Sequence, residues 1–457
     1  MRRGARWWGA CAACVMAVGL LTPLLRAQDI GAPISDLTRG QAEVLWKSYA
    51  LPDVGLPSLA PVWPARVERD GARAVVVDLE LPILKPTGKN LGRIGALREA
   101  TVDPLELDDG ETLRRWVGDE RAAVRFEGEN AFVMDVAPEE AGRSVPRGRR
   151  HDAVMAFRVM TLTPQADSDE AAEFEAQRTW FSLFMPLGET DAVLGAPVPK
   201  GVVLLMPGLF ATPEGTLERL TTRLRKSGFA VLRMWAQPSR FTQRLEFDIT
   251  PQDGLADDAA AIARAMDDRT AECAFAAREA FAHVGRARPE LAALPRGVVG
   301  FSGGAMTLPS VVALEPEKYA AAVMVGGGCC FWQMNETSNY RSMIDAVRVR
   351  WPEGTRTDAS VAELRRVVLE KSTLDSFHTA AALRGSGASV LVVQAILDEA
   401  VPSPLGDVLW KRLGRPRRLL LEAGHEPLFM QVPQHFGKMV EVIEEGVARA
   451  AERGKPE

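Results

Sequence analysis

One serine of the sequence stands where its hydroxyl could act as a nucleophile. The stretch GVVGFSGGAMT, residues 297–307, places Ser302 directly after a short apolar run and between Gly300 and Gly304. Because glycine lacks a Cβ, glycines at these two positions permit a sharp strand-to-helix turn in which the chain crosses itself closely. Such a turn would lift the hydroxyl clear of the sheet. A free hydroxyl is a poor nucleophile near neutral pH, so a base must lie within hydrogen-bond reach.

Two downstream residues have the chemistry to activate this serine. Asp398 ends the apolar run ASVLVVQAILD, and His425 ends the run RRLLLEAGH. The imidazole would take the serine proton, and the carboxylate would fix the tautomer of the ring. Glu399 is the alternative acid, because a strand end can present either of two neighbours. We interpret His378 as a helix-cap residue and His435 as a helix-surface residue.

The second part of the chain contains strands and helices that could position these groups. From Gly201 onward six apolar runs alternate with helical stretches: GVVLLMPG, GFAVLRMWA, RGVVGFS, AAAVMVGGG, ASVLVVQAILD and RRLLLEAGH. Near-continuous Val, Leu and Ile runs suit strands that helices cover on both faces. The helical stretches include GTLERLTTRLRKSG and residues 255–294. The pattern predicts a doubly wound α/β domain with a mostly parallel sheet, whose ligands lie at the carboxyl ends of the strands.

The motif G-x-S-x-G, followed by an acid and then a histidine, resembles the pattern of the α/β-hydrolase superfamily. The resemblance covers the chain from about Gly201 to the C-terminus. It implies an α/β-hydrolase fold with Ser302 as nucleophile, Asp398 as acid and His425 as base. The residues around the acid, LDEAVP, and around the histidine, AGHEPLF, look like the usual surroundings of these two groups in the family.

Two positions depart from the usual pattern of that family. Pro207 stands in the segment PGLF where a histidine often precedes the glycine, but Gly208 is in place. The backbone donor is therefore retained, and the resemblance assigns the oxyanion hole to the N–H groups of Leu209 and Gly303. Pro309 is expected to bend or shorten the helix that follows the nucleophile.

A long stretch between two of the predicted strands is expected to form a cap over the serine. Residues 331–387 show helical periodicity and far exceed an ordinary crossover connection. Four apolar or aromatic residues near its start could line an acyl or alcohol pocket, and they could equally belong to the core: Phe331, Trp332, Met334 and Tyr340.

The cysteines and histidines show neither a disulfide framework nor metal-ligand spacing. Beyond residue 27 only Cys273, Cys329 and Cys330 remain, too few for a fold built on disulfides. The adjacent pair could be small packed residues, form a vicinal disulfide, or include a partner for Cys273. No HExxH or paired-cysteine pattern occurs, so we expect neither a metal nor an organic cofactor.

The first 27 residues have the layout of a secretory signal peptide. They combine a basic start, an uncharged stretch from Trp7 to Leu25, and Ala27 as a possible cleavage point. An uncleaved membrane anchor is the alternative, because an uncharged stretch of this length could just span a bilayer. We therefore expect an exported protein, periplasmic or secreted, that contacts a membrane only if this segment is retained.

Residues 28–150 are predicted to form an N-terminal strand-rich accessory segment with little helix, before a hydrolase domain at 151–457. Short apolar runs such as ARAVVVDLELPI and ENAFVMDV alternate there with Pro, Gly and charged clusters. The next two runs, AVMAFRVMTLTP and QRTWFSLFMPLG, could belong to either part.

The charge balance argues against a nucleic-acid partner. Loss of the four arginines in the first 27 residues would take the formal net charge from -5 to -9. We interpret the one basic cluster, RSVPRGRR at 143–150, as a solvated loop.

These observations predict an exported serine hydrolase that cleaves small-molecule carboxylic esters through an acyl-enzyme on Ser302. One fold hosts many reactions, so a serine peptidase or amidase with the same triad remains open. A third possibility is a non-catalytic scaffold whose segment before Arg150 binds a partner. The sequence does not determine the oligomeric state.

Overall fold

The structure is a computed structural model. It describes residues 28–29, 51–69, 71–78, 110–126, 153–164, 172–187, 198–209, 212–235, 244–250, 254–341 and 347–453. The predicted leader, the run ENAFVMDV and the basic cluster at 143–150 lie outside these ranges. Among the helices described, none is both long enough and apolar enough to cross a membrane.

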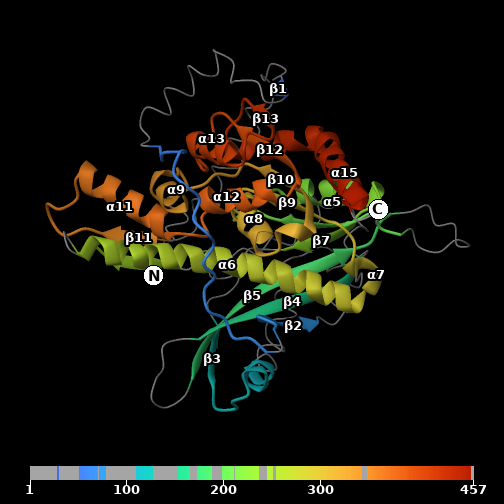
Figure 1. Ribbon diagram of the computed structural model, residues 1–457, viewed down its shortest axis with the longest axis horizontal. Coiled ribbons are helices and arrows are strands. Elements are labelled where there is room, and N and C mark those ends of the chain that lie inside the picture. The colour runs from blue at the N-terminus through green and yellow to red at the C-terminus, as the bar shows by residue number, and fades with distance from the viewer. Residues whose placement is uncertain are drawn as a thin grey trace, which may run out of the picture.

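Six parallel strands form the centre of the molecule (Figure 1). They are β6 (Val202–Met206), β7 (Ala230–Met234), β9 (Arg296–Phe301), β10 (Tyr319–Val325), β12 (Ser389–Ala395) and β13 (Arg417–Leu421). Their order in the sheet is β7-β6-β9-β10-β12-β13, and every adjacent pair is parallel. Five of these strands fall within predicted apolar runs and β10 begins one residue before its run, so the predicted doubly wound, mostly parallel sheet is confirmed.

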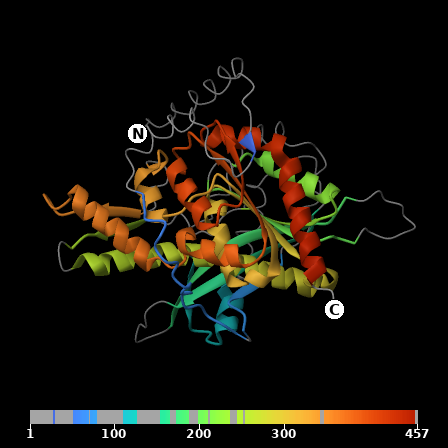
Figure 2. The ribbon, with the colours of Figure 1, turned by 45° about the horizontal axis from the view of Figure 1, so that its top comes forward.

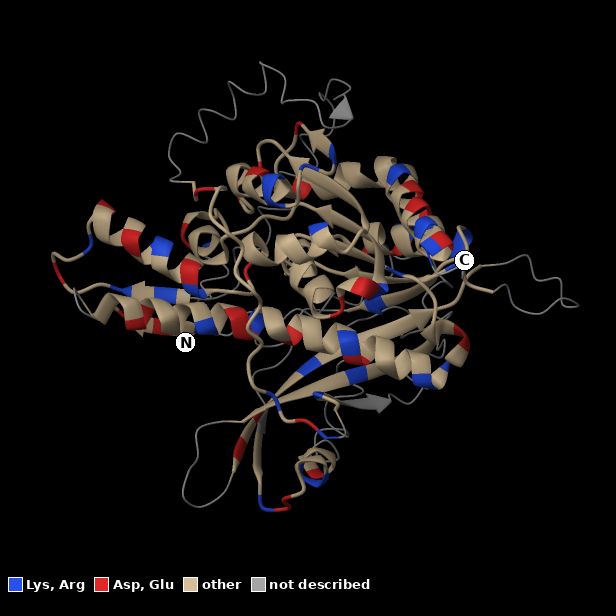
Figure 3. Cartoon of the chain, viewed as in Figure 1, with Lys and Arg blue, Asp and Glu red and all other residues tan. Residues whose placement is uncertain are grey.

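Helices cover both faces of this sheet (Figure 2). On one face lie α5 (Glu214–Lys226), α14 (His425–Gln431) and α15 (Phe436–Arg453). On the other lie α6 (Leu255–Ala287), α8 (Gly303–Leu314), α12 (Ser376–Gly385) and α13 (Ser403–Arg412). Helix α8 carries no charged residue and is buried for most of its length, whereas α15 bears charges on its outer side (Figure 3). Helix α8 continues past Pro309 and ends at Leu314.

Antiparallel strands from the N-terminal part of the chain extend the same sheet beyond β7. In order from β7 these are β5 (Glu173–Phe184), β4 (Ala153–Pro164) and β2 (Ala74–Asp78). Strand β3 (Ala123–Phe126) pairs with β5 in parallel, and β1 (Gln28–Asp29) pairs with β13 at the opposite edge. The run AVMAFRVMTLTP therefore corresponds to β4, and the run QRTWFSLFMPLG includes the second part of β5. Strands from both sides of residue 150 share one sheet.

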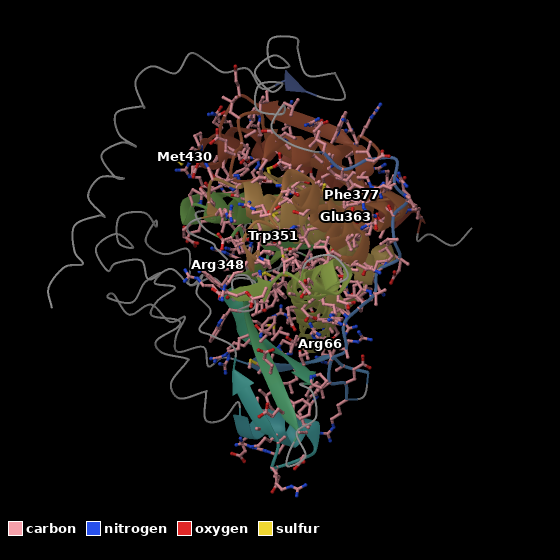
Figure 4. All side chains as sticks on the ribbon, turned by 90° about the vertical axis from the view of Figure 1, so that its left-hand side faces the viewer. Arg66, Arg348, Trp351, Glu363, Phe377 and Met430 are labelled. Atoms are coloured by element: carbon pink, nitrogen blue, oxygen red, sulfur yellow. The ribbon has the colours of Figure 1, made fainter. Side chains whose placement is uncertain are left out.

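The N-terminal region also contains a helix and a buried ion pair that fasten it to the rest. Residues 110–117 are helical, and Leu113 packs with Met160 and Leu162 of β4. The guanidinium of Arg66 lies 2.8 Å from the Glu272 carboxylate of α6, and both side chains are fully buried. Figure 4 places Arg66 where this part of the chain passes α6.

The chain between β10 and β12 builds a side structure on the α6 face of the sheet. It forms α9 (Phe331–Thr337), β11 (Val347–Arg350) and α11 (Asp358–Lys371) before it enters α12. Helix α11 packs on α6, and β11 pairs in parallel with β8 (Leu245–Asp248), which precedes α6 in the chain. Helix α12 packs on α8 and α13 instead, as an ordinary crossover helix does. The side structure therefore combines two insertions that are distant in sequence.

Candidate active site

Ser302 occupies a strained turn between β9 and α8. Its φ of 49° and ψ of -117° lie outside the regions that residues with a Cβ normally occupy. A Cβ on Gly300 would lie 2.5 Å from the carbonyl oxygen of Gly304, and a Cβ on Gly304 would lie 2.5 Å from that of Met206. Only glycine fits at both positions, because the turn brings backbone against backbone.

The structure brings Ser302, His425 and Asp398 into one chain of hydrogen bonds. Ser302 Oγ lies 2.9 Å from His425 Nε2, and His425 Nδ1 lies 2.7 Å from Asp398 Oδ2. The other carboxylate oxygen, Asp398 Oδ1, accepts hydrogen bonds from the amides of Ala400 (3.0 Å) and Val401 (2.8 Å). When its Nδ1–H donates to the carboxylate, the imidazole presents Nε2 as an acceptor to the serine hydroxyl.

The ends of neighbouring parallel strands account for this convergence. Asp398 follows β12, and His425 begins α14 shortly after β13. Beyond the strand ends the two loops remain joined, because Leu397 N donates to the carbonyl of Ala423 at 3.0 Å. Glu399, the alternative acid, is exposed and does not share this arrangement.

The other two histidines considered lie in different surroundings. His378 is buried in α12, where its Nδ1 accepts from the amide of Leu59 (3.1 Å) and its Nε2 donates to the carbonyl of Leu369 (2.8 Å). His435 ends a short 3₁₀ turn, Val432–His435, and is half-buried. His378 is therefore a buried residue within α12, and Asp375 is the N-cap of that helix.

Leu209 and Gly303 lie side by side next to Ser302. A Cβ on Gly303 would be 3.5 Å from the amide nitrogen of Leu209, and both residues border the pocket at Ser302. Within the described residues neither amide donates to a protein acceptor. Gly208 permits the approach, since its Cβ would lie 2.9 Å from Ser302 Cβ. Two N–H groups so placed could donate to an oxyanion that forms on a bound carbonyl.

A pocket opens beside the serine hydroxyl. Its apolar lining comes mainly from α6, α8, α9 and the loop after Asp398: Leu209, Met266, Met306, Phe331, Met334, Ala400 and Val401. Its polar lining includes Arg269, Thr270, Asn335, Ser338 and Tyr340. Phe331, Met334 and Tyr340 thus border the pocket, whereas the fourth candidate, Trp332, faces a separate surface hollow together with Trp351.

Arg269 is a pocket residue that the sequence analysis missed. It is only 4 % exposed and lies on α6 within a stretch that is otherwise rich in alanine. The available signal was helical spacing, which puts Arg269 on the same face as Met266, Thr270 and Cys273. A single arginine on an amphipathic helix gives no indication of the surface against which it will pack.

The cysteines are packed thiols. Cys329 and Cys330 are buried with their sulfur atoms 3.5 Å apart, and Cys273 is also buried and free. Burial raises the thiol pKa of each cysteine of the pair. Among the described residues no His, Cys, Asp and Glu side chains gather in a group that could hold a metal ion.

A buried carboxylate fixes the start of α9 at the pocket. Asp375 accepts hydrogen bonds from the amides of Cys330 (2.8 Å) and Phe331 (2.7 Å), as well as from Phe377. Burial raises the pKa of Asp375. The first turn of α9 is thereby tied to the beginning of α12.

The strand order changes direction at β6: β7 is added on one side of β6, and β9 and the later strands are added on the other. The serine turn follows β9 at this point. The acid follows β12, and the histidine follows β13. The chain has the α/β-hydrolase fold. In this version of the fold, antiparallel strands extend one edge of the sheet, and a side structure adds α9 to the wall of the pocket.

Solved structures with the α/β-hydrolase fold resemble this chain at low identity. Acetyl xylan esterase from Paenibacillus sp. R4 is 18% identical with a TM-score of 0.42, over 66% of this chain and 86% of that one. Est1E from Butyrivibrio proteoclasticus is 14% identical with a TM-score of 0.38, over 63% and 99%. Pyrococcus horikoshii acylaminoacyl peptidase is 11% identical with a TM-score of 0.37, over 63% and 40%. No protein-family model and no curated protein sequence matches. These low identities and TM-scores leave the substrate open.

Proposed function

We propose that the chain is a serine hydrolase that cleaves carboxylic esters through an acyl-enzyme on Ser302. The observation that supports this most directly is the hydrogen-bonded series from Ser302 Oγ through His425 to Asp398 at the pocket. A hydroxyl next to a neutral imidazole, which is in turn held by a carboxylate, is the arrangement that activates a serine.

In the proposed reaction, Ser302 Oγ attacks the ester carbonyl carbon while His425 Nε2 accepts the hydroxyl proton. The carbonyl oxygen becomes an oxyanion that accepts from the N–H groups of Leu209 and Gly303. When the tetrahedral intermediate collapses, His425 returns the proton to the leaving alcohol, and the acyl group remains on the serine. Water then attacks the acyl-enzyme while His425 accepts its proton, and His425 returns that proton to Ser302 Oγ as the carboxylic acid leaves. Asp398 stays ionised throughout.

The pocket lining favours an ester with an apolar acyl or alcohol group. Methionine, leucine and phenylalanine side chains surround the space next to Ser302. Within the described lining residues there is no carboxylate that could hold the ammonium group of a peptide N-terminus. A peptidase or amidase that uses the same three residues is the alternative, and a non-catalytic scaffold is the least supported of the three.

The test is labelling with a fluorophosphonate probe, followed by comparison of 4-nitrophenyl esters of increasing acyl length with matched 4-nitroanilides. We expect the label on Ser302, no label on Ser302→Ala, and faster turnover of the esters. Faster turnover of the anilides would favour the amidase. Folded protein that never reacts with the probe would favour the scaffold.

We also propose export, which rests only on the sequence of the first 27 residues. Expression with this leader in a bacterial host, followed by N-terminal sequencing of the extracytoplasmic fraction, tests it. A mature chain that begins at Gln28 is expected. A full-length chain retained in the membrane would point to an uncleaved anchor, and full-length protein in the cytoplasm would contradict export.

A further inference from the structure

We propose that residues 338–340 position the acid and the histidine relative to each other, with Tyr340 as a positioning residue for His425. These residues directly follow α9, which the chain reaches long before Asp398 or His425. The inference rests on the proposed function, because it concerns the alignment of the same imidazole. Neither the serine motif nor the order of its partners points to this segment.

The segment is hydrogen-bonded to the loop that carries the acid. Ser338 is buried, and its Oγ donates to the carbonyl of Ala400 at 2.7 Å. The amide of Asn339 donates to the carbonyl of Glu399 at 3.1 Å. The amide of Ala400 holds Asp398 Oδ1 from inside this loop. Ser338 and Asn339 therefore bind the carbonyl groups of two peptide bonds, and the N–H groups of the same two peptide bonds donate to the Asp398 carboxylate. We call these contacts the clamp on the acid loop.

Tyr340 extends from the same segment to the histidine. The Tyr340 and His425 rings meet edge to face, with centroids 5.8 Å apart and an interplanar angle of 89°. The phenol hydroxyl donates to the carboxylate of Glu426, the next residue along the chain. Burial and that carboxylate raise the pKa of Tyr340, so the phenol stays protonated and continues to donate. The amide of Tyr340 donates to Ser338 Oγ at 3.0 Å, which joins this contact to the clamp on the acid loop.

Two aromatic rings contact the imidazole in addition to its hydrogen bonds. Phe429 meets His425 at a centroid distance of 4.9 Å and an angle of 85°. The hydrogen bond from Nδ1 to Asp398 fixes one side of the ring. It does not prevent the ring from tilting about this bond so that Nε2 moves away from Ser302. Packing by Tyr340 and Phe429 restricts that tilt, and fixed rotamers around reacting groups are what precise alignment requires. Because Tyr340 is tethered to the acid loop, movement of the acid and of the histidine becomes coupled.

The competing role for Tyr340 is a simple pocket wall, since it also borders the substrate space. A wall residue acts on KM, whereas a positioning residue acts on kcat and on the His425–Asp398 hydrogen bond itself. Tyr340→Leu removes the ring edge, Tyr340→Phe keeps it, and Ser338→Ala loosens the clamp. Phe331→Leu is the matched control, because Phe331 borders the pocket on the first turn of α9.

The experiment measures kcat and KM for a short 4-nitrophenyl ester, together with the low-field proton NMR resonance of His425 Nδ1–H. A misplacement of up to 1 Å can lower a rate by about a hundredfold, so we expect Tyr340→Leu to lower kcat by about tenfold to a hundredfold with little change in KM. The low-field resonance should broaden or shift. Tyr340→Phe should recover most of kcat, Ser338→Ala should give an intermediate loss, and Phe331→Leu should act on KM.

A Tyr340→Leu protein with unchanged kcat and an unchanged resonance would overturn the inference, whatever its KM. If that variant does not fold, Ser338→Ala with wild-type kcat and an unchanged resonance overturns it equally. Failure of the proposed function is distinguishable, because then the wild-type protein would neither take up the fluorophosphonate nor turn over esters. The resonance would still report whether Tyr340 holds the imidazole.

Discussion

His425 Nδ1 and Asp398 Oδ2 lie 2.7 Å apart, and both side chains are only 3 % exposed. Asp398→Asn would keep the shape but present an amide N–H to Nδ1, which favours the tautomer that carries its proton on Nε2. We expect kcat for a short ester to fall by about 10³-fold to 10⁴-fold, with the fold intact. Glu399→Gln, on the exposed neighbour, should remain within about threefold of the wild type. Similar losses in both variants would contradict the role of Asp398.

Gly304 is required by the crossing of the chain at the serine turn. A Cβ at this position would lie 2.5 Å from the carbonyl oxygen of Met206. This neighbour is a backbone atom, so no flexible side chain can move aside to make room. Gly304→Ala should therefore lower the free energy of unfolding by about 1–3 kcal/mol or more and slow the labelling of Ser302. Gly215→Ala on α5 is the control. A Cβ there meets nothing within 4 Å, so this change should be neutral or stabilising in thermal unfolding.

Asp267 on α6 makes stability depend on pH in an unusual direction. Burial raises the pKa of Asp267 to about 7, although Ser372 Oγ and the amide of Leu374 donate to its carboxylate. The unfolded chain ionises this group near pH 4, so the folded state binds the additional proton between about pH 4 and pH 7. Its contribution to stability is complete below pH 4 and is lost as the pH rises to about 7, by up to about 4 kcal/mol.

Asp267→Asn should flatten that part of the stability profile, which urea denaturation at successive pH values will measure. Asp358→Asn on the exposed first turn of α11 is the control and should leave the slope unchanged. A wild-type protein whose stability rises steadily across this range, with the same slope in Asp267→Asn, would contradict the expectation.

Arg269 places a buried guanidinium in a pocket whose other lining is mainly apolar. A guanidinium has five N–H donors and remains charged, so it can bind a substrate carboxylate in addition to protein partners. We expect Arg269→Gln to lower kcat/KM for 4-nitrophenyl hemisuccinate by about tenfold to a hundredfold. For 4-nitrophenyl butyrate the expected change is within about threefold, and Arg269→Lys should recover part of the loss. Equal losses on both esters would show that Arg269 acts through folding alone.

Local sequence properties predict the parallel core and the serine turn. The runs that became β9 and β12 are mostly apolar, apart from Arg296 in β9 and Ser389 and Gln394 in β12, as a strand covered on both faces requires. Gly300 reflects a backbone crossing within five residues, because a Cβ there would lie 2.5 Å from the carbonyl oxygen of Gly304. Such features are encoded close to where they act, so they can be read along the chain.

Which side chains surround the serine depended instead on how distant elements pack. The sequence permitted Asp398 or Glu399 as the acid, and the direction of the loop after β12 turned Asp398 inward. Arg269 came to the pocket because α6 presents that face to it, and Tyr340 because the segment after α9 passes the His425 ring. β8 and β11 pair although about a hundred residues separate them. Local periodicity determines that a helix or strand has an apolar face, but the partner for that face is chosen by burial and shape across the whole molecule.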